Sequence, residues 1–237
     1  MAFPKNHHLV FLPGLDGTGL SAEPLMKLIP SDVAVTIVRY PADRLLSFEE
    51  TIECAAKHFP AGVAPVVIAE SFSGPVAIQL IASGRVPAKG LILCATFARS
   101  PHPLLLKISR RLGVTSFIKP EMPKHFFKVL LGEEFAESLA PLWKRVHAGV
   151  SARVLDHRLG IISRVDVTRW LGKLSIPCLY LQATADRIIP SSCLADLVKS
   201  IPDLEIKRIK GPHFILQAQP QASLTAIEKF MERHNLR

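Results

Sequence analysis

The sequence has no apolar run long enough to cross a membrane, although 49% of its 237 residues are hydrophobic. A membrane-spanning helix needs about 20 consecutive, mostly apolar residues, and polar residues interrupt every apolar stretch well before that length. The first residues, MAFPKNHH, lead directly into a strand-like run and leave no room for a secretory signal sequence. We therefore expect a cytoplasmic protein with no stable membrane insertion.

Cysteine is scarce, and its spacing matches no disulfide framework or metal site. The four cysteines are Cys54, Cys94, Cys178 and Cys193, and no two of them form a C-x-x-C pair. Two of them, Cys94 and Cys178, lie inside apolar strand-like runs, where a reduced thiol behaves as a small buried hydrophobe. We expect neither disulfides nor a metal site.

Acidic residues are outnumbered, with 20 Asp and Glu against 29 Lys and Arg, which gives a formal net charge of +9. Residues 101–171 alone hold 12 basic and 6 acidic residues and so contribute +6 of this charge. Such a segment could attract an acidic partner or could simply be a solvated helical surface. Aromatic residues do not alternate with the basic ones and no nucleic-acid motif is present, so we expect no nucleic-acid partner.

Apolar strand-like runs alternate with amphipathic helix-like runs along the chain. This alternation is typical of a parallel sheet with helices on both faces, and the length suits one large domain. The strands are predicted over residues 8–12, 33–40, 65–69, 90–95, 177–183 and 204–209. The helices between and after them are predicted near residues 19–28, 47–58, 73–83, 191–200 and 221–234.

One crossover is replaced by a long insertion rich in Leu, Lys and Arg. Four stretches within it have helical spacing and end near Gly or Pro: HPLLLKISRRLG, MPKHFFKVLLG, EEFAESLAPLWKRVHAG and SARVLDHRLGIISRVD. We interpret residues 99–171 as a helical cap over the carboxyl ends of the strands, where ligands bind in open parallel sheets. Residues 1–98 and 172–237 then form the core.

The stretch AESFSG, residues 69–74, follows the buried run APVVI and places Ser71 at a strand-to-helix turn. It resembles the G-x-S-x-G nucleophile elbow, although Ala69 and Ser73 stand where that motif has glycine. Both replacements are small, so the steric requirement of the sharp turn is nearly met. Two interpretations remain open from this stretch alone: Ser71 is a nucleophile, or it caps the following helix.

Two further polar residues also follow predicted strands. Asp186 lies just past the run at 177–183, and His213 lies in a Gly-Pro loop after the strand that ends near Ile209. Each has an ordinary alternative, since Asp186 could cap a turn and a loop histidine is often inert. Their chain order with Ser71, however, is Ser, Asp, His, the order expected of one particular hydrolase scaffold.

The segment LPGLDGTG, Leu12 to Gly19, contains three glycines directly after the first strand. Its chain can bend toward the serine edge and present free backbone N–H groups, as an oxyanion hole requires. The predicted donors are the N–H groups of Leu15 and of Phe72, the residue after Ser71. The spacing of the glycines matches neither of the common nucleotide-binding loops.

Taken together, HLVFLPG, VVIAESFSG, IPCLYLQATADRIIP and KGPHFILQAQP resemble the α/β-hydrolase superfamily, in particular its small capped serine esterases and thioesterases. The resemblance covers essentially the whole chain. It implies a nucleophile Ser71, an acid Asp186, a base His213 and oxyanion N–H groups from Leu15 and Phe72. Pro13 departs from the pattern, because many relatives have the histidine of a His-Gly pair there. LPGLDGTG also resembles a segment of some plant acyltransferase-like esterases.

Only seven residues precede the first strand, so the hairpin that opens many members is expected to be missing, which leaves about six strands that are mostly or wholly parallel. The expected activity is cleavage of a small acyl ester through an acyl-enzyme on Ser71, with no metal or organic cofactor. Alternatives are a thioesterase, an acyl-carrier ester hydrolase, an acyltransferase, or a non-catalytic ligand-binding protein on the same scaffold. Either a monomer or a homodimer is compatible with the sequence. Apolar side chains that could line an acyl pocket, or could simply form the core of the cap, are Leu104 to Leu106, Phe126, Phe127, Leu130, Leu131 and Trp143.

Overall fold

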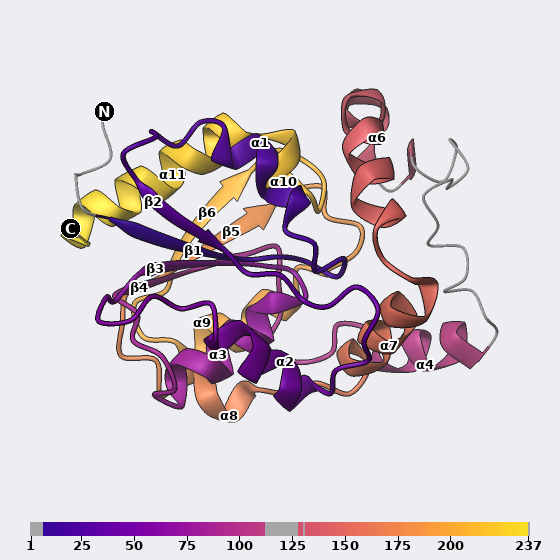
Figure 1. Ribbon diagram of the computed structural model, residues 1–237, viewed down its shortest axis with the longest axis horizontal. Helices are drawn as coiled ribbons and strands as arrows, with labels where there is room; N and C mark the ends of the chain where they lie inside the picture. The colour runs from indigo at the N-terminus through magenta and orange to yellow at the C-terminus, as the bar shows by residue number, and fades with distance from the viewer. Residues whose placement is uncertain (1–6, 112–127, 130, 237) are drawn as a thin grey trace.

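The computed structural model describes residues 7–111, 128–129 and 131–236. Its centre is a six-stranded sheet in the order β2-β1-β3-β4-β5-β6, in which every neighbouring pair is parallel (Figure 1). The predicted sheet of about six mostly or wholly parallel strands is confirmed, and it is parallel throughout. The strands are β1 (His8–Leu12), β2 (Ala34–Ile37), β3 (Val66–Glu70), β4 (Gly90–Cys94), β5 (Cys178–Ala183) and β6 (Glu205–Ile209).

The central strands are apolar throughout because both of their faces are covered. Along β1, Val10 and Leu12 face one hydrophobic cluster, and Leu9 and Phe11 face the other. Figure 1 shows the two helical layers that complete these clusters, one on each side of the sheet. One layer holds α2 (Phe48–Ala56), α3 (Ser73–Ala82), α8 (Thr168–Leu171) and α9 (Cys193–Ser200); the other holds α1 (Glu23–Met26), α10 (Ile215–Ala218) and α11 (Pro220–Arg233).

Two predicted elements differ from the structure. The helix predicted over residues 19–28 is shorter and in two pieces, a 3-10 turn η1 (Leu20–Ala22) followed by α1, and it begins after Gly19 because that residue has a left-handed backbone with φ of 75°. The strand predicted over residues 33–40 ends at Ile37. Beyond it the N–H of Tyr40 donates to the carbonyl of Gly17, 2.9 Å away, so the chain follows the loop after β1 instead of the sheet.

The strand order places a topological switch point between β1 and β3. From β1 the chain crosses to β2 on one side, and it then returns to β3 on the other side of β1. The loops that leave the carboxyl ends of β1 and β3 therefore diverge and open a crevice, which is where open parallel sheets bind ligands. The loop after β1, residues 13–19, is called the β1 loop below.

Residues 99–171 are called the inserted segment below. Their described helices are α4 (Pro103–Arg111), α6 (Glu133–Ala148), α7 (Ala152–Ile162) and α8. The two ends of the segment meet, since the N–H of Ser100 donates to the carbonyl of Val165 at 2.9 Å and Arg99 forms a β-bridge with Asp166. Figure 1 shows α6 and α7 at the right of the view, beyond the carboxyl ends of the strands. None of the helices within the described ranges is long and apolar enough to cross a bilayer.

Candidate active site

Three polar side chains that follow three different strands meet at one edge of the sheet. The Nε2 atom of His213 lies 2.9 Å from the Oγ atom of Ser71, and the Nδ1 atom of His213 lies 2.8 Å from Oδ2 of Asp186. The side chains of His213 and Asp186 are only 3% and 8% exposed, which shields their hydrogen bond from water. The structure thus brings together the three residues that the sequence pattern singled out.

Ser71 occupies a sharp turn between β3 and α3. Its backbone is left-handed, with φ of 48°, and its N–H donates to the carbonyl of Cys94 at 2.9 Å. A non-glycine residue held in this region costs on the order of 1 kcal/mol or more, and such strain is frequent at functional sites. The residue at the N-cap of α3 is Phe72, and no side chain caps this helix. Ser71 therefore does not cap α3, and its hydroxyl is directed to His213 instead.

The turn also requires the small residues that follow it. Gly74 packs against Thr96 so closely that a Cβ atom on residue 74 would lie 2.0 Å from Oγ1 of Thr96. The same Thr96 hydroxyl donates a hydrogen bond to the carbonyl of Ser71. Ser73 is fully buried, and it is more than a small residue, because its hydroxyl bonds to the carbonyl of Pro13 and to the hydroxyl of Tyr40.

The carboxylate of Asp186 is held by the loop that follows β5. Its Oδ1 atom accepts hydrogen bonds from the N–H groups of Ile188 and Ile189, both at 2.8 Å. This is the turn-capping role considered from the sequence, and it coexists with the hydrogen bond from Oδ2 to His213 because a carboxylate has two oxygens. Both contacts fix the direction in which the carboxylate faces the imidazole.

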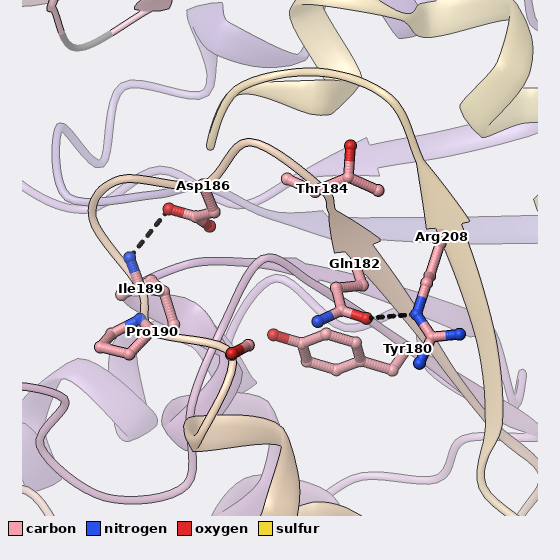
Figure 2. Close-up of a pocket in the computed structure, with 9 residues that line it drawn as sticks. Tyr180, Gln182, Thr184, Asp186, Ile189, Pro190 and Arg208 are labelled. Atoms are coloured by element: carbon pink, nitrogen blue, oxygen red, sulfur yellow. Dashed lines mark hydrogen bonds between the residues drawn. The ribbon is translucent and has the colours of Figure 1, made fainter.

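A cavity of about 300 Å³ is lined in part by Asp186 (Figure 2). Its walls come from β5, β6 and the loop after β5. Gln182 and Arg208, paired across β5 and β6, both line it and bond to each other at 3.1 Å. Neither Ser71 nor His213 lines it. It therefore borders the acid of the site and is not the place where an acyl group would meet the Ser71 hydroxyl.

No family model matches the chain, and a comparison with curated proteins finds no match. Solved structures, in contrast, match it over nearly its whole length. A bromoperoxidase from Bacillus anthracis is 14% identical, with a TM-score of 0.79 over 98% of this chain and 93% of its own. A thermophilic esterase from Thermogutta terrifontis, with malate bound, is 20% identical, with a TM-score of 0.78 over 97% and 91%. MenH from S. aureus is 17% identical, with a TM-score of 0.74 over 98% and 96%.

The chain has the α/β-hydrolase fold. The fold resemblance predicted from the sequence is therefore confirmed, with the six parallel strands in the expected places. At these identities the similarity establishes the fold alone. The neighbours themselves carry different names, from bromoperoxidase to esterase.

In this α/β-hydrolase fold, the β1 loop lies beside the Ser71 turn. A turn from Gly14 to Gly17 closes it, with 3.1 Å between the carbonyl oxygen and the N–H. The side chain of Asp16 fixes the residues that follow this turn, because its Oδ1 atom accepts a hydrogen bond from the N–H of Thr18 at 2.7 Å. A Cβ atom on Gly14 would be only 3.8 Å from the Cβ atom of Ser71, so the loop approaches the serine as an oxyanion hole would require. Leu15, one of the two predicted donors, follows directly.

Three residues next to the site were not found by sequence reasoning. Glu70, at the end of β3, is 3% exposed; it accepts from the amide of Gln217 at 2.8 Å and from the hydroxyl of Ser21 at 3.3 Å. Burial raises its pKa to about 7, against the smaller opposing effect of these hydrogen bonds. Tyr40 and Arg158 contact the Ser71 turn and the β1 loop respectively. The only available sign was an acidic residue, Glu70, at the end of an otherwise apolar run.

Of the apolar side chains proposed for an acyl pocket, Phe126, Phe127 and Leu130 lie outside the described residues. Trp143 lies near the site, since its ring packs edge-on against Phe214 with centroids 5.6 Å apart, and Phe214 packs in the same way against His213 at 5.1 Å. Leu131 is buried in the cluster that includes Trp143. Leu104 and Leu105 are 69% and 62% exposed, and Leu106 packs against the main core.

The four cysteines are free thiols, and Cys94 and Cys178 are buried as expected. Burial raises the pKa of Cys94 well above its usual range and that of Cys178 to about 12, so both thiols stay neutral near pH 7. Within the described ranges, no three His, Cys, Asp or Glu side chains are grouped so that they could hold a metal ion.

Proposed function

We propose that the protein is a serine hydrolase that cleaves carboxylic esters through an acyl-enzyme on Ser71. The supporting observation is the chain of two hydrogen bonds from the Ser71 hydroxyl through His213 to Asp186. In the proposed tautomer, the Nδ1–H group of His213 donates a hydrogen bond to the Asp186 carboxylate, so Nε2 has no proton and can accept one. That nitrogen can then remove the proton from the Ser71 hydroxyl as the oxygen attacks an acyl carbonyl.

In the proposed first step, Oγ of Ser71 bonds to the carbonyl carbon and the electron pair moves onto the carbonyl oxygen. The N–H groups of Leu15 and Phe72 stabilise this oxyanion, and Asp186 stabilises the imidazolium. His213 then gives its proton to the leaving alkoxide, so that an alcohol departs and an acyl-enzyme remains. In the second half, His213 takes a proton from water, whose oxygen attacks the same carbon, and Ser71 recovers its proton as the acid leaves. This sequence of steps requires no metal or organic cofactor.

The main experiment combines a fluorophosphonate probe with a series of p-nitrophenyl acyl esters of increasing chain length. We expect the probe to label Ser71, and we expect Ser71→Ala to lose both labelling and ester turnover. Ser192→Ala is the matched control, because Ser192 is exposed and its side chain makes no capping bond to α9. Absence of labelling and turnover in the folded wild type would instead favour a non-catalytic ligand-binding protein.

Cleavage of a thioester or of an ester on an acidic acyl carrier is a second candidate, supported by the basic inserted segment. Lys144 and Arg164 are examples of its exposed cations. If they attract a carrier, the second-order rate constant should fall steeply with salt on the carrier substrate and little on a p-nitrophenyl ester. Equal salt dependence of the two rates would remove this candidate, and a chain-length series of thioesters beside esters would identify the preferred leaving group.

A further inference from the structure

Arg158 lies on α7 of the inserted segment, yet its side chain is directed into the protein. The residue is only 5% exposed. Its Nη1 atom donates to the carbonyls of Leu15 and Asp16, at 2.9 and 2.5 Å, and its Nη2 atom donates to the carbonyl of Pro41 at 2.9 Å. The guanidinium carbon also lies 5.7 Å from the centre of the Tyr40 ring. One side chain of the inserted segment thus joins the β1 loop to Pro41, in the chain that follows β2.

The partners of this buried cation are backbone carbonyls. Among the residues that the structure describes, no ion pair includes Arg158. Burying a guanidinium is costly unless its hydrogen bonds compensate, and hydrogen bonds from a charged donor are stronger than those between neutral groups. The carbonyls of the β1 loop are therefore held to fixed positions by strong, directional contacts that depend on α7.

The β1 loop is shaped to receive the guanidinium. Gly17 has a left-handed backbone, with φ of 70°, and a Cβ atom there would lie 2.6 Å from Nη1 of Arg158. Leu15 also packs its side chain against the buried cluster that includes Val154 and Leu155 of α7. The loop that carries the predicted oxyanion donor is thus in contact with α7 through its backbone and through a side chain.

We propose that Arg158 is a positioning residue, which acts from the inserted segment by holding the β1 loop so that the Leu15 N–H stays aimed at the reacting acyl oxygen. The inference rests on the proposed function. An oxyanion donor has to lie about 2.7–3.1 Å from the position that the negative oxygen will occupy. A glycine-rich loop released from its anchor samples other positions, so the loss falls on the transition state more than on substrate binding.

The test compares Arg158→Met, which keeps much of the stem and removes the donors, with Arg158→Lys, which keeps a cation with three donors. Arg153→Met is the matched control, because Arg153 is exposed on the same helix. Active sites are counted by fluorophosphonate titration, so that kcat refers to folded enzyme. We expect Arg158→Met to lower kcat on the best p-nitrophenyl ester about 100-fold, the loss typical of one oxyanion donor, with KM within about threefold.

A second readout separates positioning from a merely structural role. A trifluoromethyl ketone forms a tetrahedral adduct on a catalytic serine, so its affinity should fall in Arg158→Met in proportion to kcat/KM. Arg158→Lys should recover about threefold to tenfold of the lost kcat and stay clearly below the wild type, since a lysine can bind one or two of the three carbonyls but not all of them. Arg153→Met should match the wild type in every measurement.

The inference is overturned if Arg158→Met retains kcat within twofold of the wild type, or if only its thermal stability falls. Where Arg158→Met does not fold, Arg158→Lys decides, because an unchanged kcat and an unchanged ketone affinity in that variant overturn the proposal equally. These outcomes are distinct from a failure of the proposed function, which would appear as full ester turnover in Ser71→Ala.

Discussion

The hydroxyl group of Ser73 donates a hydrogen bond to the carbonyl oxygen of Pro13, which joins the turn that carries Ser71 to the start of the β1 loop. A hydroxyl has one proton, so the Tyr40 hydroxyl, 2.8 Å away, must be the donor in its own contact with Ser73. The G-x-S-x-G motif has glycine at this position. The replacement by serine therefore adds a polar connection between two parts of the candidate site.

We expect Ser73→Ala to lower the free energy of unfolding by about 1–3 kcal/mol, because the Pro13 carbonyl and the Tyr40 hydroxyl each lose a partner in a buried site. Tyr40→Phe should cost less, since it leaves the Ser73 to Pro13 bond intact. Urea unfolding of both single variants and of the double variant measures their coupling, which should be non-additive. Strict additivity would show that the two hydroxyls do not depend on each other, and Ser192→Ala serves as the control.

Asp186→Asn should lower kcat on a p-nitrophenyl ester by about 10⁴-fold, as expected for the acid of such a triad. The Asn carbonyl can still accept from the Ile188 and Ile189 N–H groups in place of Oδ1, and its NH₂ then faces His213. An NH₂ group donates to Nδ1 and so moves the imidazole proton to Nε2, where it can no longer accept from Ser71. The measurement is steady-state kinetics beside a thermal melt. A loss of less than tenfold in a folded variant would contradict the assigned role.

Gly74→Ala should destabilise the fold by at least about 2 kcal/mol, because the added Cβ would have to share space with the Thr96 side chain. Thr96 cannot move freely, since its hydroxyl donates to the carbonyl of Ser71. Gly149→Ala is the matched control, because nothing lies within 4 Å of a Cβ atom at that position. Thermal unfolding of both variants is the measurement, and equal melting temperatures would contradict the close packing of the turn.

The parts of the fold that could be predicted are those with a local pattern. Strands buried on both faces produce continuous apolar runs, which is why β1 matches its predicted range, residues 8–12. The segments after β3, β5 and β6 carry Ser71, Asp186 and His213, and parallel strands bring such ends to one edge. The helix predicted near 19–28 is present only from Leu20 to Met26, as η1 and α1, and hydrophobic spacing does not reveal that Gly19 is left-handed and so lies outside it.

The contacts around the site could not be predicted because they join residues far apart in the chain. Arg158 has the spacing of an ordinary helix residue in a basic segment, and its partner Leu15 is 143 residues away. The sequence pattern places Tyr40 at the end of a predicted strand, and nothing near it in the sequence indicates a hydrogen bond to Ser73. The same distance in sequence hides Gln217, whose amide meets Glu70 across 147 residues.

The buried carboxyl of Glu70 should make the stability of the fold depend on pH. Its carboxyl is buried, and burial raises its pKa from the ordinary 4.5 to about 7. Below pH 4.5 the group is neutral in both the folded and the unfolded chain, so the difference between its two pKa values does not affect stability there. Between pH 4.5 and about 7 the unfolded chain releases the proton while the folded chain keeps it, and above about 7 the folded chain must bury a charge. Stability is therefore lost as the pH rises from 4.5 to about 7, and it stays at the lower value above that.

The difference between the unfolded and folded pKa values of Glu70 corresponds to a loss of stability of about 3 kcal/mol, at about 1.4 kcal/mol for each pH unit. Glu70→Gln removes the titration and keeps an oxygen that can accept from the Gln217 amide. Its free energy of unfolding relative to the wild type should rise by up to about 3 kcal/mol between pH 4.5 and pH 8, as measured by urea unfolding at several pH values. Glu53→Gln, an exposed position on α2, should show no such trend. A Glu70→Gln difference that stays constant with pH would mean that the carboxyl titrates alike in both states, and the buried network around Gln217 would then have to solvate the charge as well as water does.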